Sequence, residues 1–161
     1  MIYSLLTLLS IFFSPNLNKN RAQVITLEQL ASTTIRQDND SVYVVNFWAT
    51  WCKPCVAELP YFEKAGIQFA DKKVRVDLVS LDFISDKEKV NQFIQQNNIQ
   101  NIVFLLQAGD PNIWINKVDT SWSGGIPATV IYKNGKKIFF REGDFATQQE
   151  LDSVIETKIK V

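Results

Sequence analysis

The stretch NFWATWCKPCVAELP (residues 46–60) contains both cysteines of the 161-residue chain, Cys52 and Cys55. A run of β-branched and aromatic residues, VYVVNFW (42–48), leads into it and predicts a buried central strand. After Cys52 the apolar residues fall at three- and four-residue spacing, which predicts a helix. The cysteine pair is therefore expected where a strand ends and a helix begins.

This position favours redox chemistry for the pair. The first turn of a helix offers unpaired N–H groups and a partial positive charge, which stabilise a thiolate. A Cys52 thiolate can attack a disulfide, and Cys55, one turn further on, can then resolve the mixed disulfide. A bridge between the two closes so small a loop that it constrains the unfolded chain little. Thiol–disulfide exchange explains the pair better than structural cross-linking does.

The chain has no histidine, which argues against other roles for two cysteines. A zinc site needs further nitrogen or sulfur ligands, and a cysteine hydrolase needs a base that is usually His. Covalent haem needs His directly after the second cysteine, where Val56 stands. We therefore expect no metal and no organic cofactor. Two buried structural cysteines remain the alternative.

Composition and charge describe one ordinary globular domain. Lys plus Arg and Asp plus Glu number 17 each, so the formal net charge is zero, and the hydrophobic fraction is 46%. No basic surface is indicated, which argues against nucleic acid as a partner. We expect a monomer.

The N-terminal segment MIYSLLTLLSIFFS (1–14) is almost entirely apolar. It is too short for a spanning helix but matches the apolar core of a secretory signal. No basic residue precedes it, whereas Lys19 and Arg21 follow it, and no clear cleavage site is present. We expect a signal peptide or membrane anchor over 1–14, a linker over 15–23 and one domain over 24–161. A buried N-terminal element of the fold is the alternative.

Helices and strands are expected to alternate along this domain. The sequence predicts strands over 42–48, 74–82 and 101–107, a hairpin over 128–141 that turns at Asn134-Gly135, and helices over 26–35, from Cys52 with a kink at Pro60, over 85–98 with Ser85 as cap, over 110–118 and over 147–159. Strands separated by helices imply parallel crossovers, and the hairpin adds an antiparallel edge. The fold class is therefore α/β.

Two motifs carry a resemblance to a known family. VVNFWATWCKPC (44–55) resembles the active-site segment of the thioredoxin superfamily, and GGIPATVIYKNGKK (124–137) resembles its second conserved segment. WCKPCVAELP (51–60) is similar to the TlpA/ResA branch. The resemblance covers about residues 24 to 158. It implies a thioredoxin-like fold, a central mixed sheet flanked by helices, with the helix–strand insertion of that branch around 85–107.

The resemblance also implies a function. Members of this branch are typically extracytoplasmic, membrane-tethered enzymes that reduce protein disulfides, with electrons supplied by a thiol donor in the membrane. A peroxidase is not expected, because the pattern Pro-x-x-x-Thr-x-x-Cys is missing: Val45 and Ala49 occupy its places before Cys52. A disulfide oxidase or isomerase of the same fold remains an alternative, as does a non-catalytic module that binds client proteins.

Roles for single residues follow from the same resemblance. Cys52 would be the exposed nucleophile and Cys55 the buried resolving thiol, with Trp51 flanking the sulfur. Pro127 would be a cis-proline that faces the cysteines, and the backbone of Ile126 would pair with substrate. A proline at the start of a strand is the alternative for Pro127.

Three polar residues concern proton transfer. Thioredoxins carry a buried aspartate where this chain has Asn46, and an amide cannot accept a proton at neutral pH. If a carboxylate is needed, Glu58 and Asp82 are the candidates. Topology favours Asp82, because strand carboxyl ends line the active edge of such a sheet. An ordinary solvated charge is the alternative for each.

Lys53 and Pro54 separate the two cysteines. Lys53 adds positive charge beside the thiolate, and Pro54 suits the first turn of a helix. Strong oxidants and isomerases of the superfamily usually carry His at these positions, so the pair favours a reductase. Trp114 and Trp122 are expected in the core. Trp122 is nevertheless close enough to Pro127 in sequence to border the groove that Pro127 would shape for a substrate backbone.

Overall fold

The computed structural model describes residues 21–35 and 39–160. The expected leader over 1–14 and most of the expected linker over 15–23 lie outside the described residues. Within these described ranges, no helix is long and apolar enough to cross a membrane.

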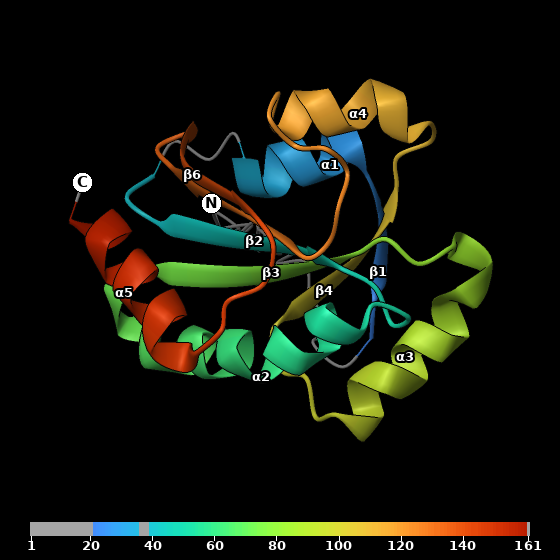
Figure 1. Cartoon of the computed structure of the whole chain (residues 1–161), viewed down its shortest axis with the longest axis horizontal. Helices are drawn as coiled ribbons and strands as arrows, with labels where there is room; N and C mark the ends of the chain where they lie inside the picture. The colour runs from blue at the N-terminus through green and yellow to red at the C-terminus, as the bar shows by residue number, and fades with distance from the viewer. Residues whose placement is uncertain (1–20, 36–38, 161) are drawn as a thin grey trace, which may run out of the picture.

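A six-stranded mixed sheet forms the centre of the described structure (Figure 1). Its strands are β1 (Gln23–Thr26), β2 (Val42–Trp48), β3 (Val74–Ser80), β4 (Ile102–Gln107), β5 (Ala128–Lys133) and β6 (Lys136–Glu142). The spatial order is β1-β4-β3-β2-β5-β6. In this order, β1, β4, β3 and β2 are parallel to one another. Strand β5 is antiparallel to β2, and β6 is antiparallel to β5. The expected α/β class and mixed sheet are confirmed.

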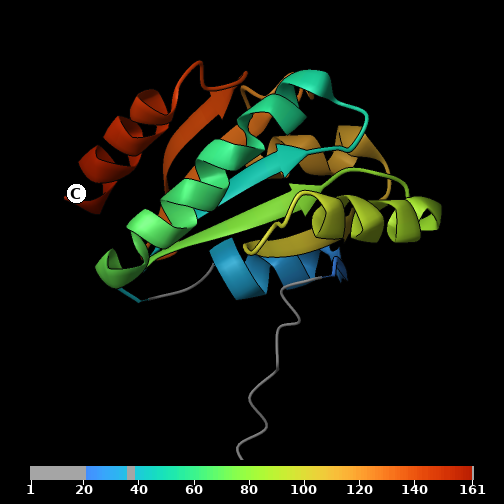
Figure 2. The same cartoon turned by 90° about the horizontal axis from the view of Figure 1, so that it is seen from below.

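Helices cover both faces of this sheet. They are α1 (Leu27–Leu30), α2 (Lys53–Gln68), α3 (Lys87–Gln96), α4 (Pro111–Val118) and α5 (Gln148–Ile159). Helices α1 and α4 lie on one face, and α2, α3 and α5 lie on the other (Figures 1 and 2). The helix–strand insertion around 85–107 is present as α3 and β4, and β4 lies between β1 and β3.

Strand β2 is buried along its whole length because both faces are covered. Val44 and Trp48 belong to the core under α2, and Val45 and Phe47 to the core under α4. This explains why its sequence is a continuous apolar run rather than an alternating one. The ring of Phe47 lies 4.9 Å from that of Trp122, which places Trp122 in the core as expected.

Two details differ from the sequence-based prediction. Strand β1 replaces part of the expected linker and helix; only Ile25 of its four residues is buried, so it carries no periodic signal. Ser85 does not cap α3, because it lies in a 3₁₀ turn over Ile84–Asp86. The helix begins after Asp86, which makes no side-chain cap. Pro60 lies inside helix α2 rather than at its start, as predicted.

Candidate redox active site

Cys52 and Cys55 form a disulfide at the N-terminus of α2. Cys52 is the N-cap residue, and its Sγ accepts a hydrogen bond of 3.3 Å from the backbone N–H of Cys55. Pro54 occupies the first turn, where a missing N–H costs nothing. A reduced Cys52 would therefore meet an N–H donor and the positive end of the helix dipole, both of which favour a thiolate.

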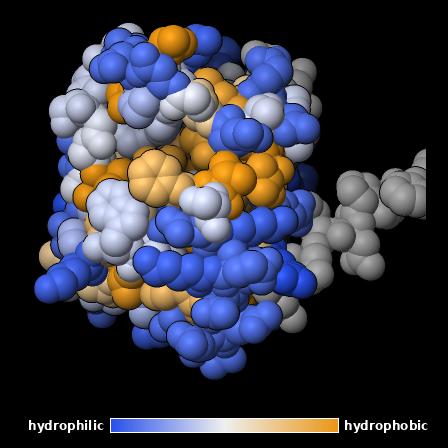
Figure 3. Space-filling model, turned by 90° about the vertical axis from the view of Figure 1, so that its right-hand side faces the viewer, coloured by the Kyte–Doolittle hydropathy of each residue, from blue (hydrophilic) through white to orange (hydrophobic). Residues whose placement is uncertain are grey.

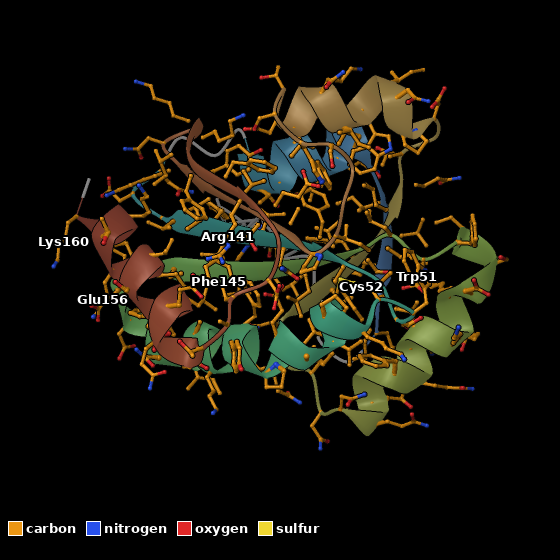
Figure 4. The ribbon with its side chains drawn as sticks, in the orientation of Figure 1. Trp51, Cys52, Arg141, Phe145, Glu156 and Lys160 are labelled. Atoms are coloured by element: carbon orange, nitrogen blue, oxygen red, sulfur yellow. A yellow bond between two sulfur atoms is a disulfide. The ribbon has the colours of Figure 1, made fainter. Side chains whose placement is uncertain are left out.

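The two sulfurs differ less in exposure than the resemblance implies. Cys55 is fully buried, but the Cys52 side chain, the expected exposed nucleophile, is itself only 6% exposed. The neighbouring Trp51 is 62% exposed and lies beside Cys52 at the same end of the molecule (Figure 4). Lys53 is exposed as well. Solvent therefore reaches the disulfide at Cys52 and not at Cys55, beside the exposed Trp51 side chain.

The Ile126–Pro127 peptide bond is cis and faces this disulfide. The Cys52 Sγ lies 3.7 Å from the carbonyl oxygen of Ile126. On the other side of the cis bond, the Pro127 carbonyl accepts a hydrogen bond of 2.8 Å from the N–H of Gly143. The structure thus brings Cys52, Ile126 and Pro127 together although 74 residues separate Cys52 from Ile126.

Glu142, which sequence reasoning missed, holds the loop that precedes this cis bond. Its carboxylate accepts hydrogen bonds from the N–H of Ser123 at 2.8 Å, from the N–H of Gly125 at 3.2 Å and from the Ser123 hydroxyl. The Trp122 indole N–H adds a bond of 2.7 Å to the Gly125 carbonyl. A Cβ at Gly125 would lie 2.3 Å from Glu142 Oε1, so this close approach requires glycine. No local sequence pattern around Glu142 indicates this role.

Glu58 lies in the core beneath the cysteines, not in solvent. Its side chain is 1% exposed and projects from α2 one turn after Cys55. Its Oε2 accepts a hydrogen bond of 2.8 Å from the N–H of Phe145, and its Oε1 accepts one of 2.9 Å from Asn46 Nδ2. Burial raises the pKa of Glu58 to about 7, although both hydrogen bonds act to lower it. A carboxyl group that titrates near neutrality can take and return a proton.

Asp82 reaches the carboxyl edge of the sheet, as topology predicted, but its carboxylate is fully engaged. It accepts hydrogen bonds from the N–H and hydroxyl of Thr50, at 2.9 and 2.6 Å, and one of 2.8 Å from the Ser80 hydroxyl. Its side chain is 3% exposed, so the alternative of a solvated charge is wrong for Asp82 as it is for Glu58. Asp82 therefore links Thr50, in the loop before Cys52, to Ser80 at the end of β3.

Exposed apolar side chains gather on the face that contains this edge of the sheet (Figure 3). Phe83 is 77% exposed and Ile113 is 61% exposed. Between the β3–α3 and β4–α4 loops lies a cavity of about 380 Å³, with Trp114 and Trp122 in its lining. In the part of the chain that the structure describes, no three His, Cys, Asp or Glu side chains are grouped so that they could hold a metal ion.

Comparison with known proteins places these features in a family. The model of the AhpC/TSA family matches residues 16–139. The thiol-disulfide oxidoreductase ResA of Oceanobacillus iheyensis is 41% identical over 56 residues, which is 35% of this chain and 28% of ResA. The match therefore spans less than a third of the length of this relative.

Solved structures resemble the whole domain. A DsbF homologue from Corynebacterium diphtheriae has a TM-score of 0.64 and 21% identity, over 80% of this chain and 75% of its own. A thioredoxin-like protein from Porphyromonas gingivalis has a TM-score of 0.57 and 27% identity, over 77% and 79% of the two chains. The expected thioredoxin-like fold is confirmed.

Proposed function

This chain belongs to the AhpC/TSA family and is a ResA-like member of the thioredoxin superfamily, and we propose that it is a thiol–disulfide oxidoreductase that reduces protein disulfides. One observation carries the proposal. The Cys52–Cys55 disulfide lies at a helix N-terminus with Cys52 Sγ 3.7 Å from the carbonyl that precedes cis-Pro127. This geometry presents one sulfur to a polypeptide and keeps the other behind it.

The catalytic cycle begins with the reduced protein. The Cys52 thiolate attacks one sulfur of a client disulfide, which forms a mixed disulfide and releases the other client sulfur as a thiolate that takes a proton from water. The Cys55 thiolate then attacks Cys52 Sγ, forms the Cys52–Cys55 disulfide and releases the second client sulfur. The client gains two electrons and two protons; both electrons come from the protein, one proton comes from water and the other from the Cys55 thiol.

Glu58 is the proposed proton acceptor for Cys55. The Cys55 thiol is fully buried, so water cannot readily take its proton. Glu58 follows one turn later on the same helix and has a pKa of about 7, so its carboxylate is partly available at neutral pH. The proton that Cys55 loses moves to Glu58 and then leaves with the released client thiol.

The cis-proline loop is the proposed binding site for the client backbone. Ile126 is only partly buried and precedes the cis bond, so an extended client segment can pair with its backbone in the manner of an added strand. Trp51, which is 62% exposed beside Cys52, offers apolar contact to the same client segment. Both residues adjoin Cys52, so a client disulfide bound there meets the attacking sulfur.

Location and electron supply complete the proposal. The apolar segment 1–14 supports a signal or membrane anchor, followed by a linker over 15–23 and the redox domain over 24–161. In an extracytoplasmic location the oxidised pair would be regenerated by a thiol donor in the membrane. The protein would act as a monomer and without an added cofactor.

The reduction potential of the Cys52–Cys55 couple tests the proposal and its direction. Equilibration of the full chain in defined thiol–disulfide buffers should give a value near about −270 mV, typical of a reductase. A value near about −120 mV would instead indicate an oxidase. No reversible couple would contradict the redox function and leave a client-binding module, whose function would survive Cys52→Ser.

A further inference from the structure

Asn46 lies at the centre of a buried polar group between β2, β5 and α2. Its side chain is fully buried, and its Nδ2 donates to Glu58 Oε1 at 2.9 Å and to Thr129 Oγ1 at 3.2 Å. Its Oδ1 is also buried but has no hydrogen-bond partner among the described residues. A buried acceptor left unpaired is costly, and no contact from the described residues at Oδ1 fixes the orientation of this amide.

The contacts of Asn46 with Glu58 and Thr129 can be made in a second way with no change of shape. If the Asn46 amide turns over, its Oδ1 faces Glu58 Oε1 and the Thr129 hydroxyl in place of Nδ2. A threonine hydroxyl can donate or accept, so it suits both orientations of the amide. Glu58 suits the second orientation only when Oε1 carries a proton, because it must then donate to the amide oxygen.

The partners of Glu58 determine where that proton binds. The Phe145 N–H can only donate, so Oε2, which it contacts at 2.8 Å, stays an acceptor in both states. The proton therefore goes to Oε1, the oxygen that faces Asn46. Beyond these contacts, the nearby charges of Asp144 and Arg141 act on Glu58 in opposite directions.

We propose that Asn46 is a positioning residue whose amide donates to the ionised form of Glu58 and, turned over, accepts from the protonated form. Glu58 can thereby gain and lose a proton inside a closed core and keep a hydrogen-bond partner at Oε1 in both states. The inference rests on the proposed function, in which Glu58 takes the proton of Cys55. Asn46 acts through Glu58 and is not itself a catalytic residue.

The variant Asn46→Asp tests this role. It places a second carboxylate where Nδ2 now lies 2.9 Å from Glu58 Oε1, and two carboxylates this close share one proton. The pair should therefore keep a proton to higher pH than Glu58 alone does. Asn91→Asp is the matched control, since Asn91 is also buried and donates to a glutamate, Glu88, but on α3.

The readout is the pH profile of disulfide exchange in one turnover, measured on the reduced full chain with insulin as the disulfide from pH 5 to 9. The wild type and Asn91→Asp should share one inflection, near pH 7. Asn46→Asp should shift it upward by at least about one pH unit, which lowers the rate at pH 7 by about fivefold or more. A profile for Asn46→Asp that matches the control, with the wild type active, would overturn the inference and leave the proposed function standing.

If Asn46→Asp fails to fold, nuclear magnetic resonance of the wild type tests the same inference. The carboxyl carbon of Glu58 and the side-chain amide of Asn46 should titrate with the same midpoint. A Glu58 that titrates beside an invariant Asn46 amide would overturn the inference. A wild type that exchanges no disulfide would instead contradict the proposed function.

Discussion

Replacing Glu58 by Gln should remove a pH-dependent loss of stability from the oxidised protein. Burial raises the pKa of Glu58 from 4.5 to about 7, so the folded protein holds this proton to higher pH than the unfolded chain does. The contribution of Glu58 to the free energy of unfolding is therefore complete below its unfolded pKa. It falls as the pH rises, until the folded group has ionised as well.

The size of the effect follows from that interval. It covers about 2.5 pH units at about 1.4 kcal/mol each, so the wild type should lose about 3.5 kcal/mol through Glu58 alone as the pH rises from below about 4.5 to above about 7. Gln at this position still accepts from the Phe145 N–H, and its amide can donate to Asn46 Oδ1 once the Asn46 amide turns over. Glu58→Gln should thus match the wild type near pH 5 and exceed its stability above pH 7.

The assay is guanidinium unfolding of both oxidised proteins, followed by tryptophan fluorescence, from pH 5 to 8.5. The chain has no histidine, so few other side chains titrate in this range, and the difference between the two proteins isolates Glu58. Glu63→Gln removes a partly exposed carboxylate from the same helix and is the control. If the difference between the wild type and Glu58→Gln is constant with pH, the argument from the buried proton is refuted.

Three further predictions concern the sulfurs and the cis-proline loop. Cys55→Ser should accumulate a mixed disulfide with insulin on a non-reducing gel, whereas Cys52→Ser should form none; the reverse pattern would exchange their roles. Glu142→Ala should raise the KM for insulin several-fold and lower kcat less, because it removes the hydrogen bonds that hold the loop before the cis bond. The control is Asp119→Asn, which alters a carboxylate that accepts from the Ser121 N–H and should leave KM unchanged. Gly125→Ala displaces the same Glu142 carboxylate, so the double variant should have a KM no higher than that of the worse single variant; additive effects would show that the two residues act separately.

Local sequence patterns are sufficient to predict the strands and helices that carry the site. The strand before Cys52 and the helix after it follow from a change of period within one short stretch, and the hairpin after Pro127 follows from Asn134-Gly135. The pairing of these two segments came from resemblance to a family. Strand β1 was not predicted. Its four residues are stabilised by pairing with β4, and their own sequence pattern does not indicate that pairing.

The polar contacts of the site were not predictable, because they depend on register between distant elements. Asn46 meets Thr129 because antiparallel pairing of β2 with β5 sets the two residues opposite each other. Asn46 meets Glu58 because α2 packs on the face of β2 that carries the even-numbered side chains. Shifting either contact by one residue would turn Asn46 to the opposite face, under α4. The sequence-based preference for Asp82 over Glu58 could not take such contacts into account, since topology locates a strand end but not the donors around it.

The absence of histidine and the presence of Asn46 have one physical explanation. In the proposed cycle the buried Cys55 needs a proton acceptor that titrates near pH 7, and burial gives that property to Glu58. A carboxylate at position 46 as well would lie against Glu58, and the two would share a proton, which the proposed exchange with Cys55 requires Glu58 to release. A single buried carboxylate, on either the strand or the helix, is therefore compatible with the proposed proton transfer. Because the helix has Glu58, the neutral amide of Asn46 suits the facing position of the strand.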